Sequence, residues 1–178
     1  MFMKMNYMIN NFSIVIPVFN EEEIFLKSAS KIYKICLEMN MPFEIIFSEN
    51  GSTDNTIKLI ETFIGDKDNC FMINSNYANY GLALKNGFES VKNEIVISFD
   101  IDYFSKKFLK QALQLDENYV ALVASKRLSE SEDERTLIRK IATSIFVFIL
   151  KILFRTSLSD THGMNCLLYT SDAADERS

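Results

Sequence analysis

Short apolar runs alternate with segments of helical periodicity along most of this chain. Compact runs typical of buried strands occur at Phe12–Val18, Phe43–Phe47, Cys70–Ile73, Glu94–Phe99 and Tyr119–Ala124. Helical spacing of apolar residues is found at Ile24–Leu37, Thr56–Ile64, Tyr80–Val91 and Phe104–Leu113, and a long helix is expected to end near Phe154. Strands that alternate with helices predict an α/β fold, with a mostly parallel sheet that is covered by helices on both faces.

Length and composition narrow the class of protein. The chain has 178 residues, of which 48% are hydrophobic and 24% charged, as is typical of one globular domain. Its net charge of −5 argues against nucleic acid as a partner. Cys36, Cys70 and Cys166 lack the spacing of a metal site, and residues 1–10 do not form a convincing signal peptide. We therefore expect free thiols and a cytoplasmic location.

Polar loops follow three of the predicted strands, at Pro17–Glu21, Ser48–Thr56 and Asp100–Asp102. The carboxyl ends of parallel strands meet at one edge of a sheet, so these loops are expected to build a single cleft. Asp100 and Asp102 can share a hard divalent cation that grips a diphosphate, although an acidic turn is the alternative for this pair taken alone. Glu49, at a strand tip, can accept a hydrogen bond from a ring N–H of a nucleobase.

Several polar residues in the same loops have a structural interpretation. Asn20 is expected to cap the first helix, with the following glutamates at its positive end. Ser52, Thr53 and Asp54 are expected to cap the second helix. The segment Asn79–Gly87 is interpreted as a helix start whose small residues allow close packing.

Together these segments resemble the family 2 glycosyltransferases, the nucleotide-diphospho-sugar transferases of GT-A fold. The resemblance is strongest to the branch that includes dolichyl- or polyprenyl-phosphate mannose and glucose synthases. The matching segments are Ser13–Glu21, Asn50–Asp54, Asn79–Ala83 with Gly87, Asp100–Asp102, Ala124–Lys126, Arg139 and Asp160–Gly163. The resemblance extends from about residue 12 to 164 and implies a Rossmann-like, mostly parallel sheet.

The resemblance also implies roles for individual residues. The residues implied to bind the nucleotide-sugar are Pro17, Phe19, Glu21, Glu49, Asp100, Lys126 and Arg139. Asp100 and Asp102 would hold the diphosphate through Mg²⁺ or Mn²⁺. Asp160 would lie near the acceptor, where it is the candidate general base for a hydroxyl. Taken alone, Lys126 and Arg139 are each better interpreted as solvated surface charges.

The function implied is an inverting, metal-dependent transfer of a sugar from a nucleotide-diphospho-sugar to a polyprenyl phosphate. Two alternatives stay open: transfer to a saccharide hydroxyl in surface-glycan synthesis, and a nucleotide-sugar-binding module without turnover. The chain departs from the family pattern at Glu49 and Asn50, where two aspartates are usual. It also has Tyr103-Phe104 where the branch tends to have Leu-Gln, and Lys126 where the branch usually has arginine.

The last third of the chain carries two further expectations. Ile141–Phe154 is strongly apolar but too short for a confident membrane span, and is either a buried core helix or a helix at a membrane surface. Basic residues flank it, and the resemblance to lipid-phosphate sugar synthases favours membrane contact over residues 139–155, at the inner face of the membrane. Residues 167–178 resemble translated sequencing-adapter bases and are expected to be non-native. The predicted domains are thus 1–11, an extension, and 12–166, a GT-A domain truncated at its C-terminus.

Overall fold

A computed structural model describes residues 10–65, 67–114, 121–123 and 165–168. Within these residues the chain forms one six-stranded sheet and four helices. The elements in chain order are β1 (Phe12–Val18), α1 (Phe25–Leu37), β2 (Phe43–Asn50), α2 (Thr56–Ile64), β3 (Cys70–Ser75), α3 (Tyr80–Glu89), β4 (Ile95–Ser98), α4 (Lys106–Ala112), β5 (Ala121–Val123) and β6 (Asn165–Leu168).

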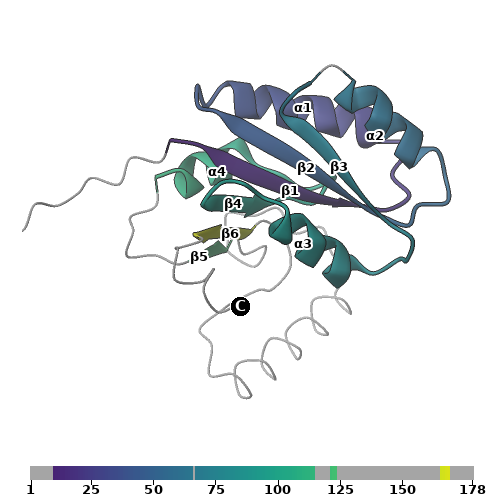
Figure 1. Cartoon of the computed structure of the whole chain (residues 1–178). Coiled ribbons are helices and arrows are strands. Elements are labelled where there is room, and N and C mark those ends of the chain that lie inside the picture. Colours follow the sequence, from purple (N-terminus) through teal and green to yellow (C-terminus); the bar gives the residue numbers. More distant parts are fainter. Residues whose placement is uncertain (1–9, 66, 115–120, 124–164, 169–178) are drawn as a thin grey trace, which may run out of the picture.

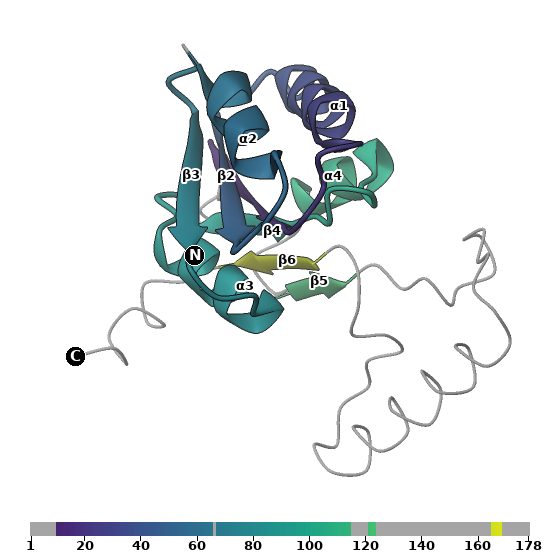
Figure 2. The same cartoon turned by 90° about the vertical axis from the view of Figure 1, so that its right-hand side faces the viewer.

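The strands lie in the order β3-β2-β1-β4-β6-β5. β1 is parallel to both of its neighbours, with Ile14 opposite Ile45 of β2 and Ile97 of β4. β3 continues the parallel pairing beside β2. β6 is antiparallel to β4 and β5, and both short strands lie beyond β4 in Figure 2. The predicted α/β class with a mostly parallel sheet is therefore confirmed.

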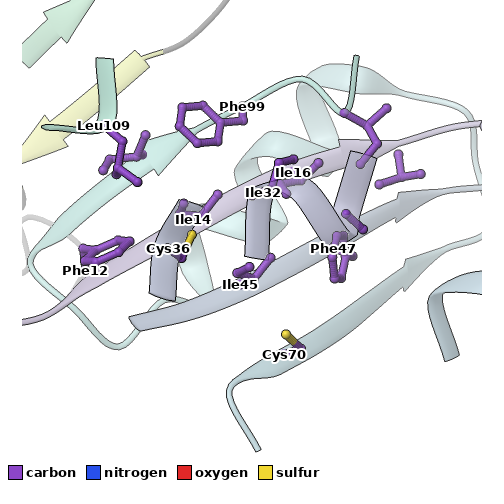
Figure 3. Close-up of a cluster of buried hydrophobic side chains, with 14 of the residues drawn as sticks. Phe12, Ile14, Ile16, Ile32, Cys36, Ile45, Phe47, Cys70, Phe99 and Leu109 are labelled. Atoms are coloured by element: carbon purple, nitrogen blue, oxygen red, sulfur yellow. The ribbon is translucent and has the colours of Figure 1, made fainter. Parts of the chain in front are cut away.

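Helices cover both faces of the sheet, as predicted. On one face, Phe12, Ile14 and Ile16 of β1 belong to a buried apolar cluster that includes residues of α1, α2 and α4 (Figure 3). On the other face α3 packs so closely on β1 that Gly87 lies against Val15. Figure 1 shows α1 and α2 on one side of the sheet and α3 on the other. A strand buried on both faces reads as a continuous apolar run, which is why β1 was predictable from sequence.

The expected helix cap at Asn20 is wrong. α1 begins at Phe25, and no side chain caps its first turn. Asn20 instead has a positive φ of 53°, a conformation that asparagine tolerates better than most residues. Its Oδ1 accepts a hydrogen bond from the N–H of Thr53, at 2.8 Å. The side chain is therefore committed to the loop after β2 and is not available to its own helix.

The predictions for the C-terminal third are mostly untested. The long helix expected to end near Phe154, and the segment 139–155, lie outside the described residues. β6 was not predicted, and its last two residues, Leu167 and Leu168, pair with β4. The proposed domain boundaries stay predictions. Among the described helices, none has both the length and the apolar character needed to cross a bilayer.

Cys36 and Cys70 are free thiols, and both are buried. Burial raises the pKa of Cys36 to about 12 and that of Cys70 to about 11. At pH 8 a thiol of pKa about 11 is only about 0.1% thiolate, which is the reactive form. We predict that iodoacetamide spares both residues in the folded chain at pH 8 and modifies both in urea. Peptide mass spectrometry checks this, and equal labelling in the two conditions would contradict it.

A second prediction concerns the contact between α3 and β1. A Cβ on Gly87 would come closer to Val15 Cγ1 than two carbon atoms can approach. Gly87→Ala should therefore lower the free energy of unfolding by about 1–3 kcal/mol, measured by urea titration. Gly81→Ala is the matched control, because a Cβ there meets only Asn79 Oδ1 at an ordinary 3.6 Å. Gly81→Ala should leave the free energy of unfolding unchanged or raise it slightly, since alanine favours helix. An equal decrease in both variants would show that the close contact with Val15 is not the cause.

Candidate functional site

The carboxyl ends of β1, β2, β3 and β4 meet at one edge of the sheet, because these four strands are parallel. The chain proceeds from β1 outward through β2 to β3, and then returns to the other side of β1 to form β4. The order therefore reverses between β1 and β4, and open α/β sheets bind ligands at such a switch point. The loops after β1 and β4 flank this point.

The loops after β1 and β2 are joined by hydrogen bonds in both directions. The N–H of Asn20 donates to Ser52 Oγ at 3.0 Å, and the N–H of Glu21 donates to Thr56 Oγ1 at 2.8 Å. Glu22 accepts from both nitrogens of Asn55, at 2.9 and 2.8 Å. These bonds turn two loops into one connected polar platform. The capping role predicted for Ser52, Thr53 and Asp54 is wrong, because Asn55 is the N-cap of α2 and its side chain makes no capping hydrogen bond; Ser52 and Thr53 bond to Asn20 instead.

Glu49 is the second-last residue of strand β2 and is fully buried. Its Oε1 accepts a hydrogen bond from the N–H of Ser52. Its Oε2 is also buried and has no hydrogen-bond partner among the described residues. A buried carboxylate oxygen without a partner is costly, so this atom is suited to accept a hydrogen bond from a ligand.

The acidic pair lies in a tight turn directly after β4. The N–H of Tyr103 donates to the carbonyl of Asp100 at 3.1 Å and closes the turn. Ile101, between the two aspartates, is only 2% exposed and belongs to the apolar cluster. This anchor leaves Asp100 half-buried and Asp102 exposed, both at the edge of the sheet.

The start of α3 connects the tip of β2 with this acidic turn. Asn79 is the N-cap of α3, and its Oδ1 accepts from the N–H of Leu82 at 3.0 Å. The N–H of Asn79 donates to Asn50 Oδ1, at 2.6 Å. The hydroxyl of Tyr80, the next residue, donates to Asp100 Oδ1 at 2.9 Å.

Negative charge accumulates at this edge. Burial raises the pKa of Glu21, and the carboxylates of Asp102, Asp54 and Asp100 raise it further. The pKa of Tyr80 is also raised, by burial and by the negative charge and hydrogen bond of Asp100. Glu21 therefore lies within electrostatic reach of Asp102, Asp54 and Asp100. A bound cation would relieve their mutual repulsion.

Hard oxygen donors of this kind suit Mg²⁺ or Mn²⁺. Within the described part of the chain, no group of three or more acidic, histidine or cysteine side chains is arranged to hold a metal ion. Asp100 and Asp102 offer two carboxylates. Two protein ligands suit a cation that completes its coordination shell with phosphate oxygens and water.

The structure brings together only part of the predicted site. Pro17 is buried in β1, and Phe19 directly after it is 40% exposed at the same edge. Glu21, Glu49 and the acidic turn lie around the ends of the same neighbouring strands. The remaining predicted residues lie outside the described residues; they are Lys126, Arg139 and Asp160.

Sequence reasoning missed Tyr80. The segment that contains it was interpreted as an ordinary helix start, and Asn79 does cap the helix. The contact of Tyr80 with Asp100 joins residues 20 apart in sequence, and it depends on how α3 crosses the sheet. A tyrosine in the first turn of a helix carries no signal for such a contact.

The sheet and its helices define an α/β protein whose candidate ligand site lies at the switch point. Comparison with solved structures identifies the fold as GT-A. Glucosyl-3-phosphoglycerate synthase from Mycobacterium tuberculosis, solved with Mn²⁺, UDP and phosphoglyceric acid, matches with a TM-score of 0.62 and 17% identity. The match covers 90% of this chain and 56% of that one. The mannosyltransferase PcManGT from Pyrobaculum calidifontis, in complex with GDP-Man and Mn²⁺, matches with a TM-score of 0.55 and 19% identity. That match covers 65% of this chain and 35% of the mannosyltransferase.

Residues 13–175 match the family described as Glycosyl transferase family 2, and the chain belongs to that family. The undecaprenyl-phosphate 4-deoxy-4-formamido-L-arabinose transferase of Proteus mirabilis is 34% identical over 97 residues, which are 53% of this chain and 29% of that protein. The enzyme of the same name from Yersinia pestis (strain Pestoides F) is 32% identical over 103 residues, 56% of this chain and 31% of the relative. The matched region therefore spans less than a third of the relatives' length.

The platform between the first two loops yields a further prediction. Asp54 Oδ1 accepts from the N–H of Thr56 at 2.9 Å, and its Oδ2 accepts from the N–H of Glu22 at 3.2 Å. Asp54→Ala removes both bonds and should lower the free energy of unfolding by about 1 kcal/mol. Asp68→Ala, at an exposed loop position before β3, is the control and should change little. Urea titration compares the two, and indistinguishable midpoints would contradict the role of Asp54.

Proposed function

We propose that this chain is the donor-binding part of a glycosyltransferase that moves a sugar from a nucleotide-diphospho-sugar to a polyprenyl phosphate. The observation that carries the proposal is the placement of Asp100 and Asp102 at the switch point, next to the joined loops after β1 and β2. Family membership supports the reaction type, and the names of the relatives support a lipid-phosphate acceptor.

In this proposal the nucleotide lies along the ends of β1 and β2. Phe19 is exposed enough to lie beside the base or the ribose, and Pro17 shapes the strand end beneath it. Glu49 Oε2 is buried without a partner among the described residues, so it is the atom best placed to accept a base N–H. A ring N–H of either uracil or guanine would satisfy it. The identity of the base therefore depends on the rest of the pocket.

Asp100 and Asp102 would hold Mg²⁺ or Mn²⁺ together with the diphosphate. The bound cation would supply Lewis-acid stabilisation of the charge that develops on the departing nucleoside diphosphate. Glu21 lies within electrostatic reach of both aspartates, so the positive charge of the cation would also stabilise its carboxylate. Lys126 and Arg139 are proposed to neutralise phosphates of the donor or the acceptor, a role that suits their charge.

The acceptor oxygen would attack the anomeric carbon from the face opposite the leaving group and so invert its configuration. Holding donor and acceptor in line supplies much of the acceleration. A phosphate acceptor is already ionised and needs no general base; Asp160 would serve as one only if the acceptor were a saccharide hydroxyl. An acceptor in the membrane would place the enzyme at the cytoplasmic face of the bilayer, with residues 139–155 in contact with it.

The central experiment is calorimetry of the chain against UDP- and GDP-sugars, each with and without Mn²⁺. The proposal expects binding to one nucleotide class, with affinity that increases when Mn²⁺ is present. Product analysis then separates the alternatives: the full-length protein should release nucleoside diphosphate when polyprenyl phosphate is added. Release with a saccharide instead would favour the hydroxyl acceptor, and binding without release would favour a binding module. No binding to any nucleotide-sugar would overturn the proposal.

The carboxylate pair is tested by single substitutions. Asp100→Asn and Asp102→Asn each remove one negative charge from the proposed cation site while preserving side-chain size. Each should weaken Mn²⁺-dependent donor binding at least about tenfold, measured by calorimetry, because amide oxygens are weaker ligands than carboxylates for a hard cation. Asp68→Asn, on the exposed loop before β3, is the control and should bind as the unchanged chain does. Unaltered binding in both site variants would remove the pair from the cation site.

A further inference from the structure

Tyr80 begins α3, which covers the face of the sheet opposite to α1, and its hydroxyl reaches the acidic turn from that face. Tyr80 is the first residue of α3, and its Oη donates to Asp100 Oδ1 at 2.9 Å. The tyrosine is 50% exposed, so its ring is not part of the apolar core. Its contact with Asp100 therefore calls for an explanation other than packing.

The backbone of Tyr80 is held firmly relative to β2. The preceding residue, Asn79, donates its N–H to Asn50 Oδ1 at 2.6 Å. Three residues after Tyr80, the carbonyl of Ala83 accepts from Ser48 Oγ at 2.7 Å. Both partners lie in the last three residues of β2. The first turn of α3 is thus fixed to the sheet on both sides of the tyrosine.

The backbone of Asp100 is fixed independently. Its carbonyl accepts from the N–H of Tyr103, and the next residue, Ile101, is buried in the apolar cluster. The freedom that remains to Asp100 is rotation about its side-chain bonds. The hydrogen bond from Tyr80 restricts this rotation, because it holds Oδ1 beside the hydroxyl of a residue whose backbone is anchored. Oδ1 is engaged by the tyrosine, and Oδ2 is the oxygen through which Asp100 would meet a ligand.

We infer that Tyr80 is a positioning residue, whose hydroxyl orients the Asp100 carboxylate so that Oδ2 and the Asp102 carboxylate together meet the divalent cation of the donor complex. Groups that hydrogen-bond to metal-ligating carboxylates set ligand orientation in this way. The inference rests on the proposed function, because an oriented carboxylate matters only where a cation binds. It adds a residue outside the acidic motif to the donor site.

The same contacts connect the two halves of the donor site. Asn50 follows Glu49 directly in β2, and Asn50, Asn79, Tyr80 and Asp100 form a continuous path of hydrogen bonds and adjacent residues. The first residues of α3 therefore contact both the proposed base-binding end of β2 and the proposed cation site. A shift of α3 would move both.

The test uses Tyr80→Phe, which removes the hydroxyl and keeps the ring. Binding of Mn²⁺ to the full chain is followed by electron paramagnetic resonance of the free ion, in the presence of UDP and separately of GDP. The dissociation constant for Mn²⁺ should increase about tenfold in the variant. Tyr77→Phe is the matched control: Tyr77 lies three residues away, is 74% exposed, and its hydroxyl bonds to no described residue. The Tyr77→Phe variant should bind Mn²⁺ as tightly as the unchanged chain does. Both variants should unfold at the same temperature as the unchanged chain.

A double-mutant cycle then asks whether Tyr80 acts through Asp100. In an Asp100→Asn background, Tyr80→Phe should cause less than about a twofold further loss of Mn²⁺ affinity, because the oriented carboxylate is already gone. Independent losses that multiply would overturn the inference, as would an unchanged affinity in Tyr80→Phe alone. If the unchanged chain binds no Mn²⁺ with either nucleotide, the proposed cation site fails and the positioning role fails with it. Binding by the unchanged chain with no effect of Tyr80→Phe overturns only the positioning role.

Discussion

Every residue of β1, from Phe12 to Val18, is buried, so the sheet must be covered on both faces at this strand. Burial also requires hydrogen-bonding neighbours on both edges, because unpaired backbone groups in the interior are costly. β2 and β4 supply them, both parallel to β1. The carboxyl end of β1 therefore emerges between two other strand ends. The closeness of Glu21 to Asp100 and Asp102 follows from this arrangement and needs no long-range signal of its own.

Strand order brings the loops together, but polar side chains set their geometry. Asn20 and Glu22 bond to the loop after β2, and Asn79 joins the tip of β2 to α3. These contacts lie at the exposed edge of the sheet, where each hydrogen bond replaces one to water and contributes only modestly to stability. Their main effect is to fix the relative positions of loops that would otherwise move independently. Precision of that kind is what a site for a charged ligand requires.

The fold was largely predictable because its signals are local. The apolar run Phe12–Val18 gave both bounds of β1, and the cap Asn79 marked the start of α3. The sequence was less informative where polar residues continue a strand. The segment Ser48–Asn50 was expected to be loop, yet it pairs with both β1 and β3. Ser48 Oγ and Asn50 Oδ1 find partners at the sheet edge, so polarity alone did not signal the end of pairing. The strand β6 pairs with β4 from far along the chain, and no local pattern encodes a pairing of that range.

The site shows the same division between local and long-range information. The acidic turn was evident from a strand end followed by alternating aspartates, whereas the hydroxyl that contacts it comes from another helix. The two departures from the family pattern can also be understood structurally. Asn50 provides an acceptor for the N–H of Asn79 without adding a charge to an edge where carboxylates already raise the pKa of Glu21. Glu49 is long enough for one carboxylate oxygen to bond within its own loop while the other has no partner among the described residues. Neither departure therefore disturbs the contacts between these loops, since Asn50 bonds to Asn79 and Glu49 bonds to Ser52.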